Sequence, residues 1–187
     1  RTGVRRESRE LVVEHAYKVL LVDDHPIVRQ GLAELINRES DMKVCGQAES
    51  GAAALEMTEK SQPDLALVDI SLDDMSGLVL VKGLKARQRN LRVLILSMHD
   101  EALYAERALR AGAHGYIMKR EAPTNVITGI RRVLAGDVYL SEDISARIMR
   151  KFAGGTDAAD ESPVARLSDR ELEVYNHIGQ GLKTGQI

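Results

Sequence analysis

The chain has 187 residues, of which 44% are hydrophobic, 29% charged and 3% aromatic. This length and apolar content exclude disorder throughout and allow one ordinary domain with a small second one. The formal net charge of −2 provides no basic surface by composition alone, so nucleic-acid binding must rest on a motif. Cys45 is the only cysteine, which excludes an internal disulfide and a multi-cysteine zinc site.

Two further absences indicate where the protein works. No apolar run reaches the roughly 18 residues that a membrane span needs. The segment 1–16 is a polar tail that leads into no apolar stretch, so we expect no signal peptide. A cytoplasmic protein without a membrane partner is therefore expected.

Residues 17–135 alternate short aliphatic runs with stretches of helical periodicity. The expected strands are Tyr17–Val22, Met42–Ala48, Leu65–Val68, Arg92–Leu96 and Gly115–Met118. The expected helices are Ile27–Ile36, Ala52–Lys60, Leu78–Gln88, Ala102–Ala111 and Pro123–Ala135. Successive strand–helix units produce parallel strands, because each helix returns the chain across the sheet. The strands lack polar alternation, as expected when helices cover both faces. The pattern predicts an α/β, flavodoxin-like, doubly wound five-stranded parallel sheet.

The character of the chain changes after Gly136. Residues 136–165 read as a linker with a possible helix over Ser141–Phe152, because Ser141 can cap a helix that begins with acidic residues. Small and acidic residues dominate 153–163, a composition typical of a flexible connection.

Residues 166–187 begin a second, all-helical domain. Ser168 and Glu171 have capping-box spacing at the start of a helix predicted over Asp169–Gln180. The apolar face of this helix consists of Leu172, Tyr175 and Ile178. So short an element cannot bury this face itself, and we expect it to be mobile, to dock on the first domain or to pair with another copy.

Polar side chains follow the predicted strands at one edge of the sheet. Asp23 and Asp24 follow the first strand, Asp69 the third, Ser97 the fourth and Lys119 the fifth. The carboxyl ends of parallel strands form the crevice in which such sheets bind ligands. Two carboxylates about 4 Å apart repel by about 4 kcal/mol at an effective dielectric near 20. A hard divalent cation relieves this repulsion, and the oxygen-rich ligand set favours Mg²⁺.

These residues lie in motifs that resemble a known family. The segments are LLVDDHPIVRQGL, LALVDISLDDMSGL, LILSMHD and GAHGYIMKREAP. Together they are similar to the receiver domain of two-component response regulators. The segment RLSDRELEVYNHIGQGLKTGQI resembles the opening of a LuxR-type helix-turn-helix, which makes the chain similar to the NarL/FixJ subfamily. The resemblance implies a receiver domain over 17–135 and an incomplete DNA-binding domain over 166–187.

The resemblance also implies roles for the polar edge. Asp69 would accept a phosphoryl group from a histidine kinase, and Lys119 would contact the resulting acyl phosphate. Mg²⁺ would be bound by Asp23, Asp24, Asp69 and the backbone carbonyl of Ser71.

The same family likeness implies a switch and an output. Ser97 would turn toward the phosphoryl group, and Tyr116 would swing inward as its companion, although a half-buried strand aromatic explains Tyr116 equally well. Phosphorylation would then change a DNA-binding, transcription-regulating output, with a homodimer as the expected active form.

The sequence departs from the family pattern at two places. Asp73 stands where proline is usual, so an extra carboxylate lies near the expected metal site. Lys183, Thr184 and Gly185 stand where Ser, Asn and Lys are common. The recognition helix would lie beyond Ile187, so the DNA-binding residues stay unassigned.

Other readings of the same residues lead to different functions. A phosphatase or hydrolase would need an acidic residue two positions after Asp69, where the chain has Ser71. We therefore expect no enzyme, and at most self-phosphorylation from small donors and self-dephosphorylation. A receiver that acts only through protein contacts is the remaining alternative. His25 and His99 lie near the rim and are interpreted as solvated loop histidines.

Overall fold

The computed structural model describes residues 16–99, 101–153, 164 and 167–179. Most of the predicted tail, residues 154–163 of the linker and the segment 180–187 lie outside the described residues. Lys183, Thr184 and Gly185, which depart from the family pattern, therefore also lie outside the described residues.

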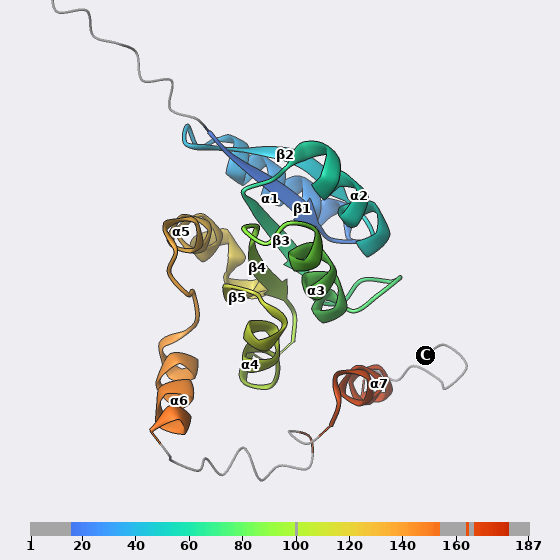
Figure 1. Cartoon of the computed structure of the whole chain (residues 1–187), viewed down its shortest axis with the longest axis vertical. Helices are drawn as coiled ribbons and strands as arrows, with labels where there is room; N and C mark the ends of the chain where they lie inside the picture. Colours follow the sequence, from blue (N-terminus) through green and yellow to red (C-terminus); the bar gives the residue numbers. More distant parts are fainter. Residues whose placement is uncertain (1–15, 100, 154–163, 165–166, 180–187) are drawn as a thin grey trace, which may run out of the picture.

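Five parallel strands form a single sheet in the order β2-β1-β3-β4-β5 (Figure 1). Their bounds are β1 Tyr17–Val22, β2 Met42–Ala48, β3 Leu65–Asp69, β4 Arg92–Ser97 and β5 Gly115–Met118. From the interior strand β1 the chain goes to β2 at one edge and then crosses to the central strand β3, from which it continues through β4 to β5 at the other edge. This order confirms the flavodoxin-like, doubly wound prediction.

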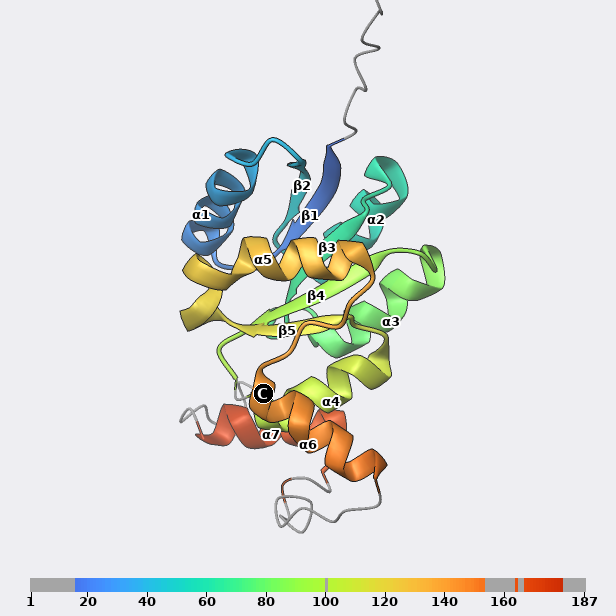
Figure 2. The same ribbon diagram turned by 90° about the vertical axis from the view of Figure 1, so that its left-hand side faces the viewer.

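Helices cover both faces of the sheet (Figure 2). The receiver helices are α1 Pro26–Asn37, α2 Gly51–Ser61, α3 Gly77–Arg87, α4 Glu101–Ala111 and α5 Ala122–Ala135. Alternate residues of a strand point to opposite faces. Val19 and Leu21 of β1 therefore pack in a core with α1 and α5, whereas Leu20 and Val22 pack in a core with α2, α3 and α4. Burial on both faces explains why the strands are uninterrupted apolar runs.

The ends of the strands differ from the prediction at the functionally important edge. β3 continues through Asp69, which pairs with Leu96, and β4 continues through Ser97, which pairs with Met118. Polar residues extend these strands because neighbouring strands supply their backbone hydrogen bonds. After β5, a 3₁₀ turn, η1, spans Lys119–Glu121 before α5 begins. The polar edge is thus built partly into the regular sheet.

Two helices follow the receiver. Helix α6 spans Glu142–Phe152 and packs against α4, and the backbone N–H of Ser141 donates to the Glu101 carboxylate at 2.9 Å. Helix α7 spans Asp169–Gly179, with a capping box in which the Ser168 N–H donates to Glu171 at 2.7 Å. Within the described parts of the chain, every helix is too short or too polar to cross a membrane.

Part of the apolar face of α7 has a partner within the chain. Leu172 is fully buried and belongs to the core that includes α3 and α4. Tyr175 and Ile178 remain more than half exposed. Of the three outcomes expected for this helix, the structure shows docking on the first domain, and Leu172 makes the contact.

Candidate functional site

Acidic side chains from two central strands meet at the carboxyl edge of the sheet. Asp23 and Asp24 follow β1, and Asp69 ends the neighbouring strand β3. Together with His25, they offer ligand atoms that all lie within 4.8 Å of one another. The sequence placed the three carboxylates at this edge, and the strand order brings them together because β1 and β3 are adjacent.

A lysine from the far side of the site joins two of these carboxylates. The Lys119 Nζ lies 2.8 Å from Asp23 Oδ2 and 2.7 Å from Asp69 Oδ2. Asp23 and Asp69 are only 2% and 3% exposed. The η1 turn positions Lys119 directly after β5, so its side chain reaches across β4 to β3 and β1. A buried ion pair with two carboxylates per ammonium leaves net negative charge in the site.

Burial and neighbouring charges together determine the protonation of Asp69 and Lys119. Burial raises the pKa of Asp69 to about 6, although the Lys119 ammonium opposes the shift and Asp23 adds to it. Burial alone would lower the pKa of Lys119, but the attraction of Asp69 and Asp23 raises it above the ordinary value. Lys119 is therefore held in its cationic form, and Asp69 is a carboxylate that additional positive charge would stabilise.

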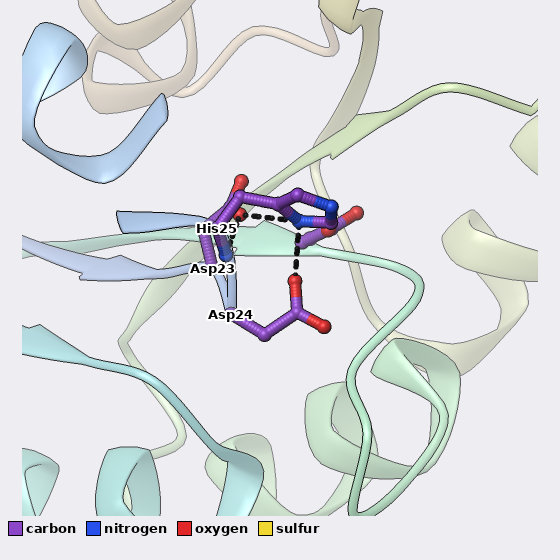
Figure 3. A group of neighbouring side chains, drawn as sticks. Asp23, Asp24 and His25 are labelled. Carbon is purple, nitrogen blue, oxygen red and sulfur yellow. Dashed lines mark hydrogen bonds and ion pairs between the residues drawn. The ribbon is translucent and has the colours of Figure 1, made fainter. Parts of the chain in front are cut away.

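His25 is bound to this cluster rather than free in solvent (Figure 3). Its Nδ1 lies 2.5 Å from Asp24 Oδ1 and 3.3 Å from Asp23 Oδ1. Its backbone N–H also donates to Asp23 Oδ1 at 2.9 Å. The ring is largely exposed, as expected for a solvated loop histidine, but it also contacts the carboxylates of Asp23 and Asp24.

The donor set fits a hard divalent cation. Asp23, Asp24 and Asp69 contribute carboxylate oxygens from close range, and Mg²⁺ prefers such ligands together with water. The excess negative charge beside a single ammonium would favour the binding of a further cation. The Ser71 N–H donates to Asp69 Oδ1 at 3.3 Å, so the loop that carries the expected carbonyl ligand is tied to the Asp69 carboxylate.

The loop after Asp69 is also held by contacts that sequence reasoning missed. The carboxylate of Asp74 accepts hydrogen bonds from the backbone N–H groups of Gly51 and Ala52 at 2.9 and 3.0 Å, at the start of α2. A Cβ at Gly77 would lie 2.5 Å from the backbone oxygen of Asp69, so the return of this loop requires glycine. Asp73 is exposed. No local spacing indicates the Asp74 contact, because its partners lie on another strand–helix unit.

The expected switch residues meet on one loop residue. Ser97 is fully buried, and its Oγ accepts from the His99 N–H at 3.0 Å. The Tyr116 hydroxyl donates to the backbone oxygen of His99 at 2.9 Å, and Tyr116 is 1% exposed. Tyr116 thus already occupies the inward position that the resemblance gives to the phosphorylated state. It is not the half-buried strand aromatic of the alternative interpretation.

Comparisons with known proteins agree with this architecture. Residues 19–131 match the response regulator receiver domain family. A nitrate/nitrite response regulator protein homolog of Haemophilus influenzae is 32% identical over 170 residues, which cover 91% of this chain and 79% of the relative. The response regulator UvrY of Escherichia coli is 32% identical over 169 residues, covering 90% of this chain and 77% of UvrY.

Solved structures show the same likeness. A two-component response regulator of the LuxR family from Aurantimonas sp. SI85-9A1 is 31% identical, with a TM-score of 0.68. The match covers 74% of this chain and 99% of that structure. The receiver fold, the acidic cluster and the relatives lead to one conclusion. The chain belongs to the response regulator family, as a two-component receiver with NarL- and UvrY-type relatives.

Proposed function

We propose that Asp69 accepts a phosphoryl group from a sensor histidine kinase in the presence of Mg²⁺, and that this event switches a DNA-binding, transcription-regulating output. The observation that carries the proposal is the position of the Asp69 carboxylate. It is buried between the Lys119 ammonium and the carboxylates of Asp23 and Asp24. Burying an aspartate next to two other carboxylates is electrostatically unfavourable, which supports a functional rather than a structural role for Asp69.

The geometry supports in-line phosphoryl transfer. One oxygen of Asp69 attacks phosphorus, the bond from phosphorus to the kinase histidine nitrogen breaks, and the electron pair of that bond stays on the nitrogen. Lys119 holds one Asp69 oxygen and neutralises charge on the incoming phosphoryl group. When bound by Asp23, Asp24, Asp69 and the Ser71 carbonyl, Mg²⁺ would offset the charge that develops on the phosphoryl oxygens.

The output half of the proposal rests on Ser97, Tyr116 and α7. Ser97 ends β4, the strand next to the β3 strand of Asp69, and Tyr116 on β5 binds the His99 backbone oxygen two residues after Ser97, so both can respond to a new phosphoryl group. Helix α7 carries the capping box that resembles the first helix of a LuxR-type domain. A homodimer formed on phosphorylation would match paired DNA half-sites. The chain would be a phosphoacceptor rather than an enzyme with a separate substrate.

The proposal is tested by incubating the chain with acetyl phosphate and Mg²⁺ and recording its intact mass. One added, alkali-labile phosphoryl group is expected, and Asp69→Asn or chelation of the metal should abolish it. Asp137→Asn, an exposed carboxylate far from the rim in sequence, is the matched control and should be labelled like the parent. Equal labelling of Asp69→Asn would refute the assignment.

The partner proposals have separate tests. Light scattering that gives one mass before and after stoichiometric phosphorylation would count against the dimer. Gel shift of the full-length gene product separates a DNA-binding output from a receiver that acts through protein contacts alone. The former predicts retarded promoter fragments, and the latter predicts none.

A further inference from the structure

His99 links four segments around the acceptor site. Its Nε2 shares a hydrogen bond of 2.7 Å with Ser71 Oγ, on the loop after β3. Its ring stacks on Tyr104 of α4, with ring centroids 5.0 Å apart and planes 30° apart. Its backbone N–H and oxygen bind Ser97 of β4 and Tyr116 of β5. A loop residue with a single structural task would not need all of these contacts.

The side-chain contacts of His99 fix its backbone. The ring is attached on one side to Ser71 and rests on Tyr104, which is itself buried. With the ring held, the backbone oxygen of His99 stays where the Tyr116 hydroxyl can donate to it at 2.9 Å. The described part of the loop after β4, Met98 and His99, is thus held against the loop after β3 while Tyr116 lies inward.

We propose that the Ser71–His99 hydrogen bond is a latch that pre-organises the loop after β4 for the phosphorylated state, with His99 as a positioning residue. The inference rests on the proposed function, because it assumes that a phosphoryl group on Asp69 is bound more tightly when the loop after β4 is already in place. Without the latch, part of the binding free energy of that group is used to close the loop. The latch acts through side-chain hydrogen bonding and stacking, whereas the metal ligand expected from Ser71 is its backbone carbonyl, which Ser71→Ala retains.

The test uses beryllofluoride, a phosphoryl mimic, with Mg²⁺ and the full chain. Ser71→Ala and His99→Phe should each weaken its binding about three- to tenfold, the effect of one hydrogen bond. Phenylalanine can still stack on Tyr104, so His99→Phe removes the hydrogen bond selectively. The double variant should lose no more than either single one, because both remove the same bond. Ser71→Thr, which keeps a hydroxyl, should restore most of the affinity.

Met98→Ala is the matched control, since Met98 is in the same loop and is 72% exposed. It should bind like the parent. Additive losses in the double variant, or parental affinity of Ser71→Ala, would overturn the latch.

A second measurement judges the latch without any phosphoryl mimic. Amide hydrogen exchange in a peptide that spans residues 97–104 should become faster in both single variants and stay unchanged in Met98→Ala. Unchanged exchange in Ser71→Ala would overturn the latch even if binding weakened. If the parent itself took up neither beryllofluoride nor phosphate, the proposed function would fail, and the exchange result would still decide whether the latch exists.

Discussion

The carboxylate rim and the contact of α7 with α4 both join opposite charges, yet they do so in different surroundings. At the rim, the side chains of Lys119 and Asp23 are 9% and 3% exposed and lie 2.8 Å apart. At the α7 contact, those of Arg107 and Asp169 are 18% and 41% exposed and lie 2.9 Å apart. The two ion pairs therefore have nearly the same distance but differ in how strongly solvent screens them.

The difference determines what each region can do. In the buried rim, an unpaired charge is costly, so the groups keep a fixed geometry and depend on one another. At the α7 contact, solvent screens the ion pair, and the buried Leu172 supplies apolar packing against the core that includes α3 and α4. The rim is suited to chemistry that needs fixed positions, whereas the α7 contact is suited to opening and closing.

The largest expected effect comes from Lys119→Met. This change leaves Asp23 and Asp69 buried without their cation, which should lower the free energy of unfolding by about 3 kcal/mol at pH 8. The pKa of Asp69, already about 6 in the folded chain, should rise further. A raised folded-state pKa means that the folded chain binds the proton more tightly, so stability is lost as pH rises from about 4 through that pKa. The deficit should thus be smaller at pH 5.

Urea unfolding at pH 5 and pH 8 measures this effect. Lys60→Met is the control, because Lys60 pairs with Glu56 on an exposed helix surface and should change stability by less than about 0.5 kcal/mol. A deficit for Lys119→Met that is equal at both pH values would mean that the rim is less buried than the structure has it.

Leu172→Ala tests the other side of the comparison. Removing this fully buried side chain should weaken the docking of α7 by about 2–3 kcal/mol and leave the receiver core intact. Amide exchange over residues 167–178 should therefore accelerate, while the receiver strands stay protected. Tyr175→Ala, on the exposed part of the same helix, should leave exchange unchanged. Faster exchange throughout residues 17–135 would contradict a separable contact.

Arg107→Ala should have the smallest effect. Arg107 donates to Asp169 at 2.9 Å and to the Leu167 backbone oxygen, but solvent reaches the pair and Lys82 also lies 3.8 Å from Asp169. We expect the free energy of α7 docking to fall by about 1 kcal/mol. Amide exchange over residues 167–178 should therefore become modestly faster, and the effect of the substitution should be smaller at high salt. The control is Arg110→Ala, because Arg110 is an exposed arginine on α4, the helix that also carries Arg107. An effect larger than that of Leu172→Ala would reverse our ranking of the contacts.

Local pattern was sufficient to predict most of the receiver fold. Buried runs such as Leu65–Val68 are strands because both faces are covered, and their spacing requires parallel crossovers. The ends were less predictable, since Asp69 and Ser97 belong to strands only through pairing with Leu96 and Met118. Strand pairing depends on neighbours that the local sequence does not specify.

The site likewise combines residues that local sequence predicts with residues whose roles depend on distant parts of the chain. Asp23, Asp69 and Lys119 were placed together because each follows or ends a strand at one edge of the sheet. The roles of His99 and Asp74 were not predictable, because their partners lie on other strand–helix units and no sequence spacing indicates them. The docking of Leu172 likewise depends on a surface formed by α3 and α4.

The most direct test of the central claim is to locate the phosphoryl group in the parent chain. The chain is phosphorylated with acetyl phosphate and Mg²⁺, reduced with borohydride, which converts an aspartyl phosphate to homoserine, and then digested for tandem mass spectrometry. Our account predicts homoserine at Asp69 alone, because Asp69 is the buried carboxylate at the end of β3 that contacts Lys119, whereas Asp23, which also contacts Lys119, is expected to hold the metal. Homoserine at Asp23 or Asp24, with Asp69 unchanged, would contradict it.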